Sequence, residues 1–213
     1  MWRICLLILP LPALACDRPV CAVDPMELEL EREITFDDLP SSAGPGRAVN
    51  DVLALPGAAF GERFAGQSVE ADGNFDRVIG QPLAPLALLP GDPARNVAIL
   101  RLYATNVLSP TGPMGYPRHE ATGEGALAIL FERPQSALRF DLRGGEGGTA
   151  TVVFLDPSGA EIDRHDISAL SEHSYGFERV DGRADIAGLL VTNADPDGIA
   201  LDTLAFDPPP FGS

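Results

Sequence analysis

Three carboxylates near the two ends of the chain are the side chains best placed for chemistry. Asp37 and Asp38 directly follow Phe36, and Asp202 stands two residues before Leu204. Because side chains alternate between the two faces of a strand, Asp38 should share the face of Phe36, and Asp202 the face of Leu204. If those apolar residues face a core, both carboxylates lie at its edge. An ionised carboxylate there needs hydrogen-bond donors or a cation.

Two kinds of partner suit these carboxylates. Calcium binds several oxygen ligands and favours carboxylates, so Asp37, Asp38 and Asp202 form a candidate site for a structural Ca²⁺ ion. The alternative is structural hydrogen bonding, in which Asp38 caps the turn at Pro40 and Asp202 accepts backbone N–H groups. The residues alone leave both interpretations open.

The rest of the sequence holds no arrangement typical of a catalytic centre. His119, His165 and His173 are spaced neither as a zinc site nor as a catalytic pair, and no Gly-x-Ser-x-Gly motif is present. A glycoside hydrolase would need two carboxylates placed across a cleft. The residues with strand spacing that could supply them are Glu27, Glu29 and Glu31. They lack aromatic neighbours, so we expect the protein not to be an enzyme.

The first 15 residues have the pattern of a signal peptide. Arg3 is followed by an apolar run and then by Ala13-Leu14-Ala15 directly before Cys16. The run is far shorter than the roughly 20 residues that cross a membrane as a helix, so we expect no transmembrane helix. This pattern predicts a secreted or periplasmic protein.

Cys16 has two alternative fates after such processing. In an oxidising compartment it could form a disulfide with Cys21. It could instead carry a lipid, because a cysteine directly after a cleavage site is also where bacterial lipoproteins are acylated, which would anchor the protein at Cys16. Both alternatives stay open.

Composition excludes two broad classes. The 213 residues include 45% hydrophobic residues, which is too apolar for a wholly disordered chain and enough for one domain with a core. The net charge of −16 would repel a phosphate backbone, so we expect no nucleic-acid partner. The same acidity would attract divalent cations.

Short apolar runs separated by turn residues predict an all-β protein. Glycine and proline number 22 and 20, and they fall between the runs rather than inside them. Residues 138–143 alternate apolar and charged side chains, as expected of a strand over a core, whereas residues 150–155 are apolar on both faces and indicate a central strand. The predicted strands are 34–39, 60–64, 76–80, 97–103, 126–132, 136–143, 149–156, 161–167, 175–180, 186–192 and 199–206.

These runs predict an antiparallel β-sandwich over residues 34–207, after a lead segment at 16–33 and before a tail at 208–213. Residues 40–58 and 104–125 are rich in glycine and proline and are expected to be loops. The second is long for a compact domain, and long loops on a rigid scaffold tend to carry binding residues.

The order of motifs resembles a known class of secreted bacterial domains. Ile34-Thr35-Phe36-Asp37-Asp38-Leu39-Pro40, the strand at 136–142, the Asp156-Pro157-Ser158-Gly159 turn and Ile199-Ala200-Leu201-Asp202-Thr203-Leu204-Ala205-Phe206 are similar to motifs of galactose-binding-like, jelly-roll carbohydrate-binding modules. The resemblance implies a jelly-roll sandwich whose first and last strands lie close together, with a structural calcium between them.

The leading functional hypothesis is therefore an exported, non-catalytic module that binds a saccharide or another cell-surface ligand. An extracellular structural or adhesive protein that binds a protein partner is the first alternative. A jelly-roll glycoside hydrolase is the second. An aromatic-lined concave sheet would favour the saccharide-binding module, and a flat exposed apolar patch would favour the adhesive protein. A cleft with two opposed carboxylates would favour the glycoside hydrolase.

Overall fold

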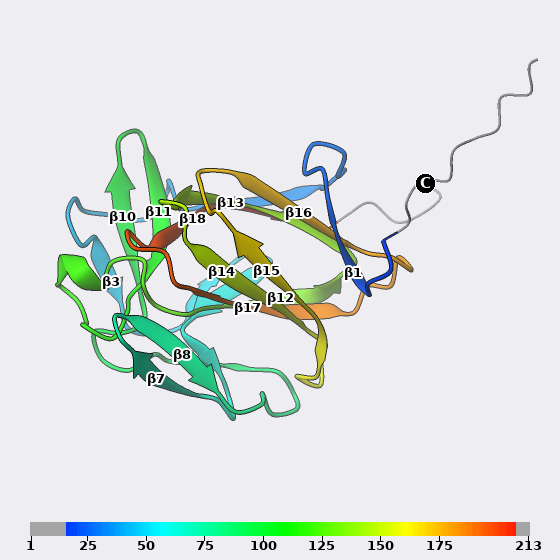
Figure 1. Cartoon of the computed structure of the whole chain (residues 1–213), viewed down its shortest axis with the longest axis horizontal. Coiled ribbons are helices and arrows are strands. Elements are labelled where there is room, and N and C mark those ends of the chain that lie inside the picture. Colours follow the sequence, from blue (N-terminus) through cyan, green and yellow to red (C-terminus); the bar gives the residue numbers. More distant parts are fainter. Residues whose placement is uncertain (1–15, 208–213) are drawn as a thin grey trace, which may run out of the picture.

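The computed structural model describes residues 16–207, and it is built almost entirely of antiparallel strands (Figure 1). The predicted signal peptide and tail lie outside the described residues. One short 3₁₀ helix, His119–Ala121, interrupts the strands. Within residues 16–207 no helix is long and apolar enough to span a membrane.

Two large sheets form the sandwich. The eight-stranded sheet is ordered β1 (Val20–Val23), β16 (Ser174–Arg179), β13 (Ala137–Gly144), β18 (Ile199–Phe206), β11 (Thr105–Pro110), β10 (Val97–Leu102) and β3 (Arg47–Val49), with β2 (Arg32–Thr35) also paired to β18. The six-stranded sheet is ordered β15 (Glu161–Ser168), β14 (Thr149–Leu155), β17 (Ile186–Asn193), β12 (Leu127–Gln135), β5 (Ala58–Gly61) and β4 (Leu53–Leu55). The all-β antiparallel sandwich predicted from the sequence is confirmed.

The main core lies between the inner faces of these sheets. It is rich in phenylalanine, with Phe36, Phe60, Phe140, Phe154 and Phe206 all at most 2% exposed. Phe36 meets Phe60 edge-on with ring centroids 5.4 Å apart, and such aromatic pairs add about 1 kcal/mol to the burial of their area. Phe36 directly follows β2 of the eight-stranded sheet, and Phe60 is on β5 of the six-stranded sheet, so their contact helps to hold the two layers together.

A segment between β5 and β10 covers the outer face of the six-stranded sheet. It contains the small pairs β6 (Arg63–Phe64) with β9 (Leu88–Leu89) and β7 (Ser68–Asp72) with β8 (Phe75–Ile79). A second apolar cluster forms where this segment packs on the sheet, from Phe64, Leu86 and Leu88 on one side and Val153 and Leu190 on the other. The doubly apolar run at residues 150–155 is therefore buried on both faces, as predicted for a central strand.

Several predicted boundaries differ from the structure. The first predicted strand, at residues 34–39, ends at Thr35 in β2, because the N–H of Leu39 bonds to the carbonyl of Phe36 and closes a turn. The predicted loop at 104–125 begins with β11. Within the predicted lead segment, β1 pairs with β16 along its whole length, so the sandwich starts before residue 34. Short strands with mixed composition are weak signals in a sequence, because cross-strand partners select them.

Candidate functional site

Asp202 lies at a β-bulge, which reverses the side-chain alternation used to predict its direction. Between β13 and β18, Asp141 is opposite Thr203 and Leu142 is opposite Leu201, so β18 has one extra residue at this point. Leu201 and Leu204 both enter the main core, although they are three residues apart. The prediction that Asp202 shares the core-facing side of Leu204 is therefore wrong, because a bulge shifts the parity by one.

Asp202 is satisfied by hydrogen bonds. Arg143 Nε donates to its Oδ2 at 2.7 Å, Arg143 Nη2 lies 2.6 Å from the same oxygen, and the Thr105 hydroxyl donates to its Oδ1 at 3.0 Å. The hydrogen bond from Arg143 to Asp202 raises the pKa of that guanidinium. A contact between a guanidinium and a carboxylate is among the stronger charge-assisted hydrogen bonds.

The structure brings Asp37 to the same place and leaves Asp38 outside it. The Oδ1 of Asp37 accepts the backbone N–H of Asn106 at 2.7 Å and lies 3.2 Å from the Thr105 hydroxyl, which also contacts Asp202. Asp38 is exposed in the turn after β2, where strand alternation no longer applies. Two of the three predicted site residues are thus neighbours across one hydroxyl.

This donor set does not fit a calcium ion well. The Arg143 guanidinium occupies the side of Asp202 that a cation would need, and its positive charge replaces that of an ion. Within residues 16–207, no group of three or more acidic, histidine or cysteine side chains is arranged to hold a metal. The geometry favours the hydrogen-bonding alternative, and calcium binding stays a prediction for the melting experiment described below.

The residues considered for catalysis do not meet in one place. Glu27, Glu29 and Glu31 are exposed in the connection between β1 and β2. His165 is on β15, where its Nε2 lies 2.8 Å from the carbonyl of Val20, and His119 begins the 3₁₀ helix.

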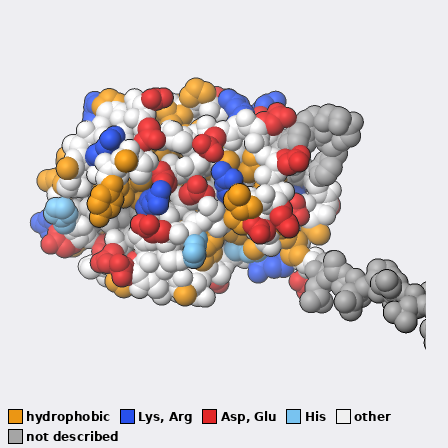
Figure 2. Space-filling view, turned by 90° about the horizontal axis from the view of Figure 1, so that it is seen from above, with side chains coloured by type: hydrophobic (Ala, Val, Ile, Leu, Met, Phe, Trp, Pro, Cys, Tyr) orange, Lys and Arg blue, Asp and Glu red, His pale blue; other side chains and the backbone are white. Residues whose placement is uncertain are grey.

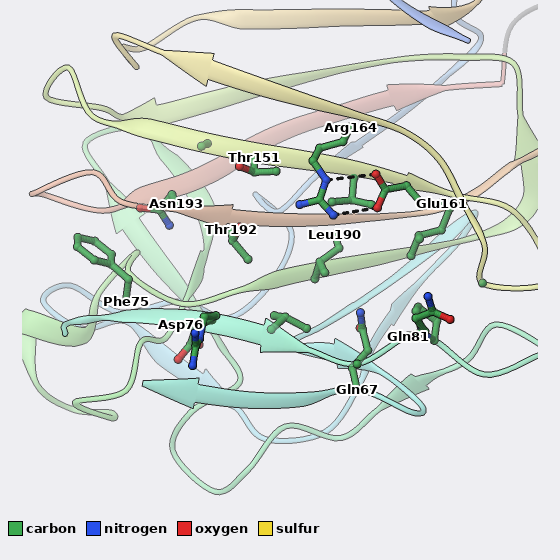
Figure 3. Close-up of a pocket in the computed structure, with 18 of the residues that line it drawn as sticks. Gln67, Phe75, Asp76, Gln81, Thr151, Glu161, Arg164, Leu190, Thr192 and Asn193 are labelled. Atoms are coloured by element: carbon green, nitrogen blue, oxygen red, sulfur yellow. Dashed lines mark hydrogen bonds and ion pairs between the residues drawn. The ribbon is translucent and has the colours of Figure 1, made fainter. Parts of the chain in front are cut away.

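A cleft lies between the β7–β8 hairpin and the outer face of β14 and β17 (Figure 3). Its volume is about 900 Å³, within the range of small-molecule sites. Apolar side chains of the sheet form its floor: Val153, Leu155 and Leu190. Val78 on β8 of the hairpin lines the cleft from the opposite side. The cleft therefore offers an apolar base between two walls of strand.

Polar groups line the walls of the cleft. Figure 3 places Phe75 and Asn193 toward one end and Gln67 and Gln81 toward the other, with Thr192 on the strand between them. These side chains are uncharged, and amides and hydroxyls can both donate and accept hydrogen bonds. The cleft is thus equipped for a ligand with many hydroxyl groups.

Four of the five charged side chains of the cleft are paired within the protein; the fifth, Asp72, is exposed and has no ion pair among the described residues. On β15, Arg164 donates to both oxygens of Glu161, at 3.2 and 2.8 Å, and this carboxylate raises the pKa of the guanidinium. On the hairpin, Arg77 pairs with Glu70 at 3.1 Å. Asp76 is fully buried and pairs with Arg95 at 2.7 Å. An anionic ligand would have to displace a carboxylate from one of these arginines.

Sequence reasoning missed this site. It predicted a strand near residue 76 but no partner for it, and it placed binding residues in the loop at 104–125. A signal was present: Gly73-Asn74 forms the two-residue turn between Asp72 and Phe75, and Gly73 has the positive φ, +64°, that such turns require. The turn predicts the hairpin, but only the fold shows which surface the hairpin covers.

Comparisons with known proteins give distant likenesses. No protein-family model and no curated protein matches the chain. Among solved structures, CsCBM6-3 from Clostridium stercorarium in complex with cellobiose aligns at a TM-score of 0.32 and 10% identity, over 56% of this chain and 86% of that chain. A non-crystalline cellulose specific carbohydrate-binding module, CBM28, aligns at 0.29 and 17% identity, over 53% and 77%. Both belong to the class that the sequence resembles, and at these TM-scores neither carries an argument about the ligand.

Proposed function

We propose that the protein is a non-catalytic binding module that holds a neutral saccharide in the cleft between the β7–β8 hairpin and strands β14 and β17. The carrying observation is the cleft itself, about 900 Å³ with an apolar floor and polar walls in which amide and hydroxyl groups stand beside charged side chains that are mostly paired. A sugar ring presents C–H groups on its faces and hydroxyls at its rim. Apolar contact with Leu190 and hydrogen bonds to Gln67, Gln81 or Thr192 suit both.

The charge arrangement supports a neutral ligand. Glu161 and Arg164 neutralise each other, and Arg77 is paired with Glu70. The net charge of −16 would also repel a polyanion. A neutral saccharide can therefore bind in this cleft without electrostatic repulsion and without breaking an ion pair.

The same arrangement supports a role without catalysis. Glycoside hydrolysis needs one carboxyl to give a proton and a second to act as base or nucleophile across the sugar. Of the carboxylates at the cleft, Glu161 is held by Arg164, Asp76 is completely buried, and Asp72 is exposed without an ion pair among the described residues. The hydrolase alternative thus has no opposed pair with free access to a ligand among these residues.

The N-terminal region supports export. The Cys16–Cys21 disulfide that the structure contains is typical of proteins in oxidising compartments. A cysteine sulfur in a disulfide cannot also carry a thioether-linked lipid, so this pairing favours a secreted or periplasmic protein over one anchored at Cys16.

Titration calorimetry tests the function with soluble cello-, xylo- and manno-oligosaccharides on the mature protein. We expect at least one series to bind, and Phe75→Ala to weaken that binding about tenfold by removing the aromatic contact of the cleft, worth about 1.4 kcal/mol. Tyr103→Ala is the matched control, since Tyr103 is fully exposed at the turn between β10 and β11. Binding lost with Tyr103→Ala but kept with Phe75→Ala would place the site elsewhere, and no binding at all would refute the saccharide.

The adhesive alternative finds less support on the face shown in Figure 2. Hydrophobic side chains there are scattered among acidic and basic ones and form no broad continuous patch. A surface of that kind does not offer the flat apolar contact that a protein partner would favour.

A further inference from the structure

The β7–β8 hairpin, which forms one wall of the cleft, has little packing of its own. Along β7, Ser68, Glu70, Ala71 and Asp72 are exposed, and the hairpin belongs to neither large sheet. In Figure 1 it lies at the lower edge of the molecule. An isolated two-stranded hairpin is marginally stable in water, so other contacts must hold it in place.

Asp76 provides most of the polar contacts that do so. Its side chain is 0% exposed, its Oδ1 accepts from Arg95 Nη2 at 2.7 Å, and its Oδ2 accepts from the backbone N–H of Ala126 at 3.1 Å. Its own N–H donates to the carbonyl of Glu124 at 3.2 Å. One hairpin residue is therefore bonded both to the segment that leads into β12 and to the loop before β10.

A second buried carboxylate lies in the same cluster. Glu62 is 0% exposed, and its Oε2 accepts from Arg63 Nη1 and from the backbone N–H of Asp92 at 3.4 Å. Its Oε1 has no hydrogen-bond partner, and neither do Arg95 Nε and Asn96 Oδ1. Burial raises the pKa of Glu62, and the neighbouring charge of Asp76 raises it further.

We propose that Asp76 is a positioning residue of the cleft: its bonds to Arg95 and Ala126 hold the β7–β8 hairpin at the distance from β14 and β17 that makes the cleft. The role in ligand binding rests on the proposed function, whereas the attachment of the hairpin does not. A hairpin released from Asp76 would lose its place over Leu190, and its strand pairing would open more often, because an isolated hairpin is marginally stable in water.

The bonding pattern demands a carboxylate at this position. Asp76 accepts two N–H donors, one on each oxygen. In Asp76→Asn the side chain has nearly the same shape, but its NH₂ group would face either the Arg95 guanidinium or the Ala126 N–H, donor against donor. One of the two bonds is then lost, at a site where water cannot replace it.

Hydrogen–deuterium exchange of the mature protein tests this proposal without a ligand. We expect Asp76→Asn to speed exchange in peptides of residues 68–79 at least tenfold, with no change in peptides of residues 150–155 in β14. Glu70→Gln is the control from the same hairpin, because its ion pair with Arg77 is exposed, and its exchange should match the wild type. Arg95→Gln removes the same bond from the other side and should likewise speed exchange more in the hairpin than in β14.

The outcomes separate the two proposals. If exchange in the hairpin is unchanged in Asp76→Asn and Arg95→Gln, the proposed positioning role of Asp76 is wrong. It is also wrong if exchange speeds up equally in the hairpin and in β14, because that would show only a role in global stability. If the wild type binds no oligosaccharide of the panel, the saccharide function fails, but the exchange pattern still tests whether Asp76 positions the hairpin. If it binds one, Asp76→Asn should weaken that binding and Glu70→Gln should not.

Discussion

Two peripheral segments of this protein are tied to the sandwich by an aspartate–arginine pair, and the two pairs work in opposite electrostatic settings. The N-terminal strap, residues 16–23, is held where Arg18 meets Asp163 of β15 at 2.6 Å and where the N–H of Val20 donates to the same carboxylate at 3.1 Å. The β7–β8 hairpin is held where Arg95 meets Asp76 at 2.7 Å. The side chains of Arg18 and Asp163 are 46% and 9% exposed, whereas those of Arg95 and Asp76 are 23% and 0% exposed.

The pKa values of the two aspartates move in opposite directions. Partial burial of Asp163 opposes ionisation, but hydrogen bonds from Arg18, Val20 and Arg164 outweigh it and lower its pKa to about 2. Burial of Asp76 dominates, and it raises the pKa although Ala126 and Arg95 donate to the carboxylate. The comparison teaches that similar ion-pair distances have different consequences. Ionised Asp163 stabilises the attachment of the strap, whereas ionised Asp76 costs stability because it is buried and instead fixes the position of the hairpin.

The largest effect should come from Arg95→Met. It leaves the Asp76 carboxylate buried without its charged partner, and breaking a buried pair from one side costs about 3 kcal/mol. Urea unfolding followed by circular dichroism measures the loss. Arg18→Met is the matched change at the strap and should lower the unfolding midpoint much less, because the Arg18 side chain is 46% exposed and solvent screens its charge. Equal losses at the two sites would remove the distinction.

The next effect concerns the disulfide that closes the strap. Cys16 and Cys21 are five residues apart, and the contacts of Arg18, Pro19 and Val20 lie inside this small loop. Replacing both cysteines by serine should cost roughly 2 kcal/mol, because the unfolded chain regains the freedom of the loop. Unfolding of the wild type should respond to a reductant by a similar amount.

Mass spectrometry of the exported protein supplies the control for that prediction. We expect a chain that begins at Cys16 and is two hydrogens lighter than its reduced form. A lipid-modified Cys16, or a wild type whose stability ignores the reductant, would contradict the disulfide-closed strap.

A smaller effect is the pH dependence, which should have opposite signs at the two regions. The pKa of Asp163 is lowered in the fold from 3.8 to about 2, so its contribution to stability is present above pH 3.8 and is lost as the pH falls toward 2. The pKa of Glu62 is raised above 4.5, so its ionised form costs stability at neutral pH, and this cost disappears as the pH falls through the raised value.

Two substitutions separate these contributions. Glu62→Gln should be at least as stable as the wild type at pH 7, and its advantage should shrink toward pH 4.5. Asp163→Asn should be less stable than the wild type at pH 7, and the two should converge near pH 2. Unfolding curves across this range measure both differences, and parallel pH profiles for the two variants would contradict the assignment.

The smallest expected effect is that of calcium. Because Arg143 pairs with Asp202, we expect the same melting temperature in calcium and in chelator, and Asp202→Asn should lower it equally in both. If Asp37, Asp38 and Asp202 did bind Ca²⁺, the ion at 100 times its dissociation constant would add roughly 2.7 kcal/mol. A chelator-reversible rise in the wild type that is absent in Asp202→Asn would restore the metal site.

Much of the sandwich, and part of the candidate calcium site, could be predicted from the sequence. The alternation of Leu138, Phe140 and Leu142 with charged residues predicts β13, and all three side chains are in the main core. Asp37 and Asp202 were expected near each other at the two ends of the domain, and they meet at Thr105. Arg143, the partner of Asp202, was not foreseen, because nothing local in the sequence relates positions 59 residues apart.

What the sequence by itself determined is the strand content, since alternating apolar residues and Gly- or Pro-rich turns act over a few neighbouring residues. What only the tertiary structure decided depends on contacts between distant segments. The bulge at Asp202 exists because β18 must pair with β13 in a shifted register, and it reverses the direction of one side chain. The cleft exists because Asp76 bonds the hairpin of residues 68–79 to Arg95 and Ala126 and so holds it beside β14 and β17. Such docking buries charge and apolar surface between parts of the chain that a local pattern cannot bring together.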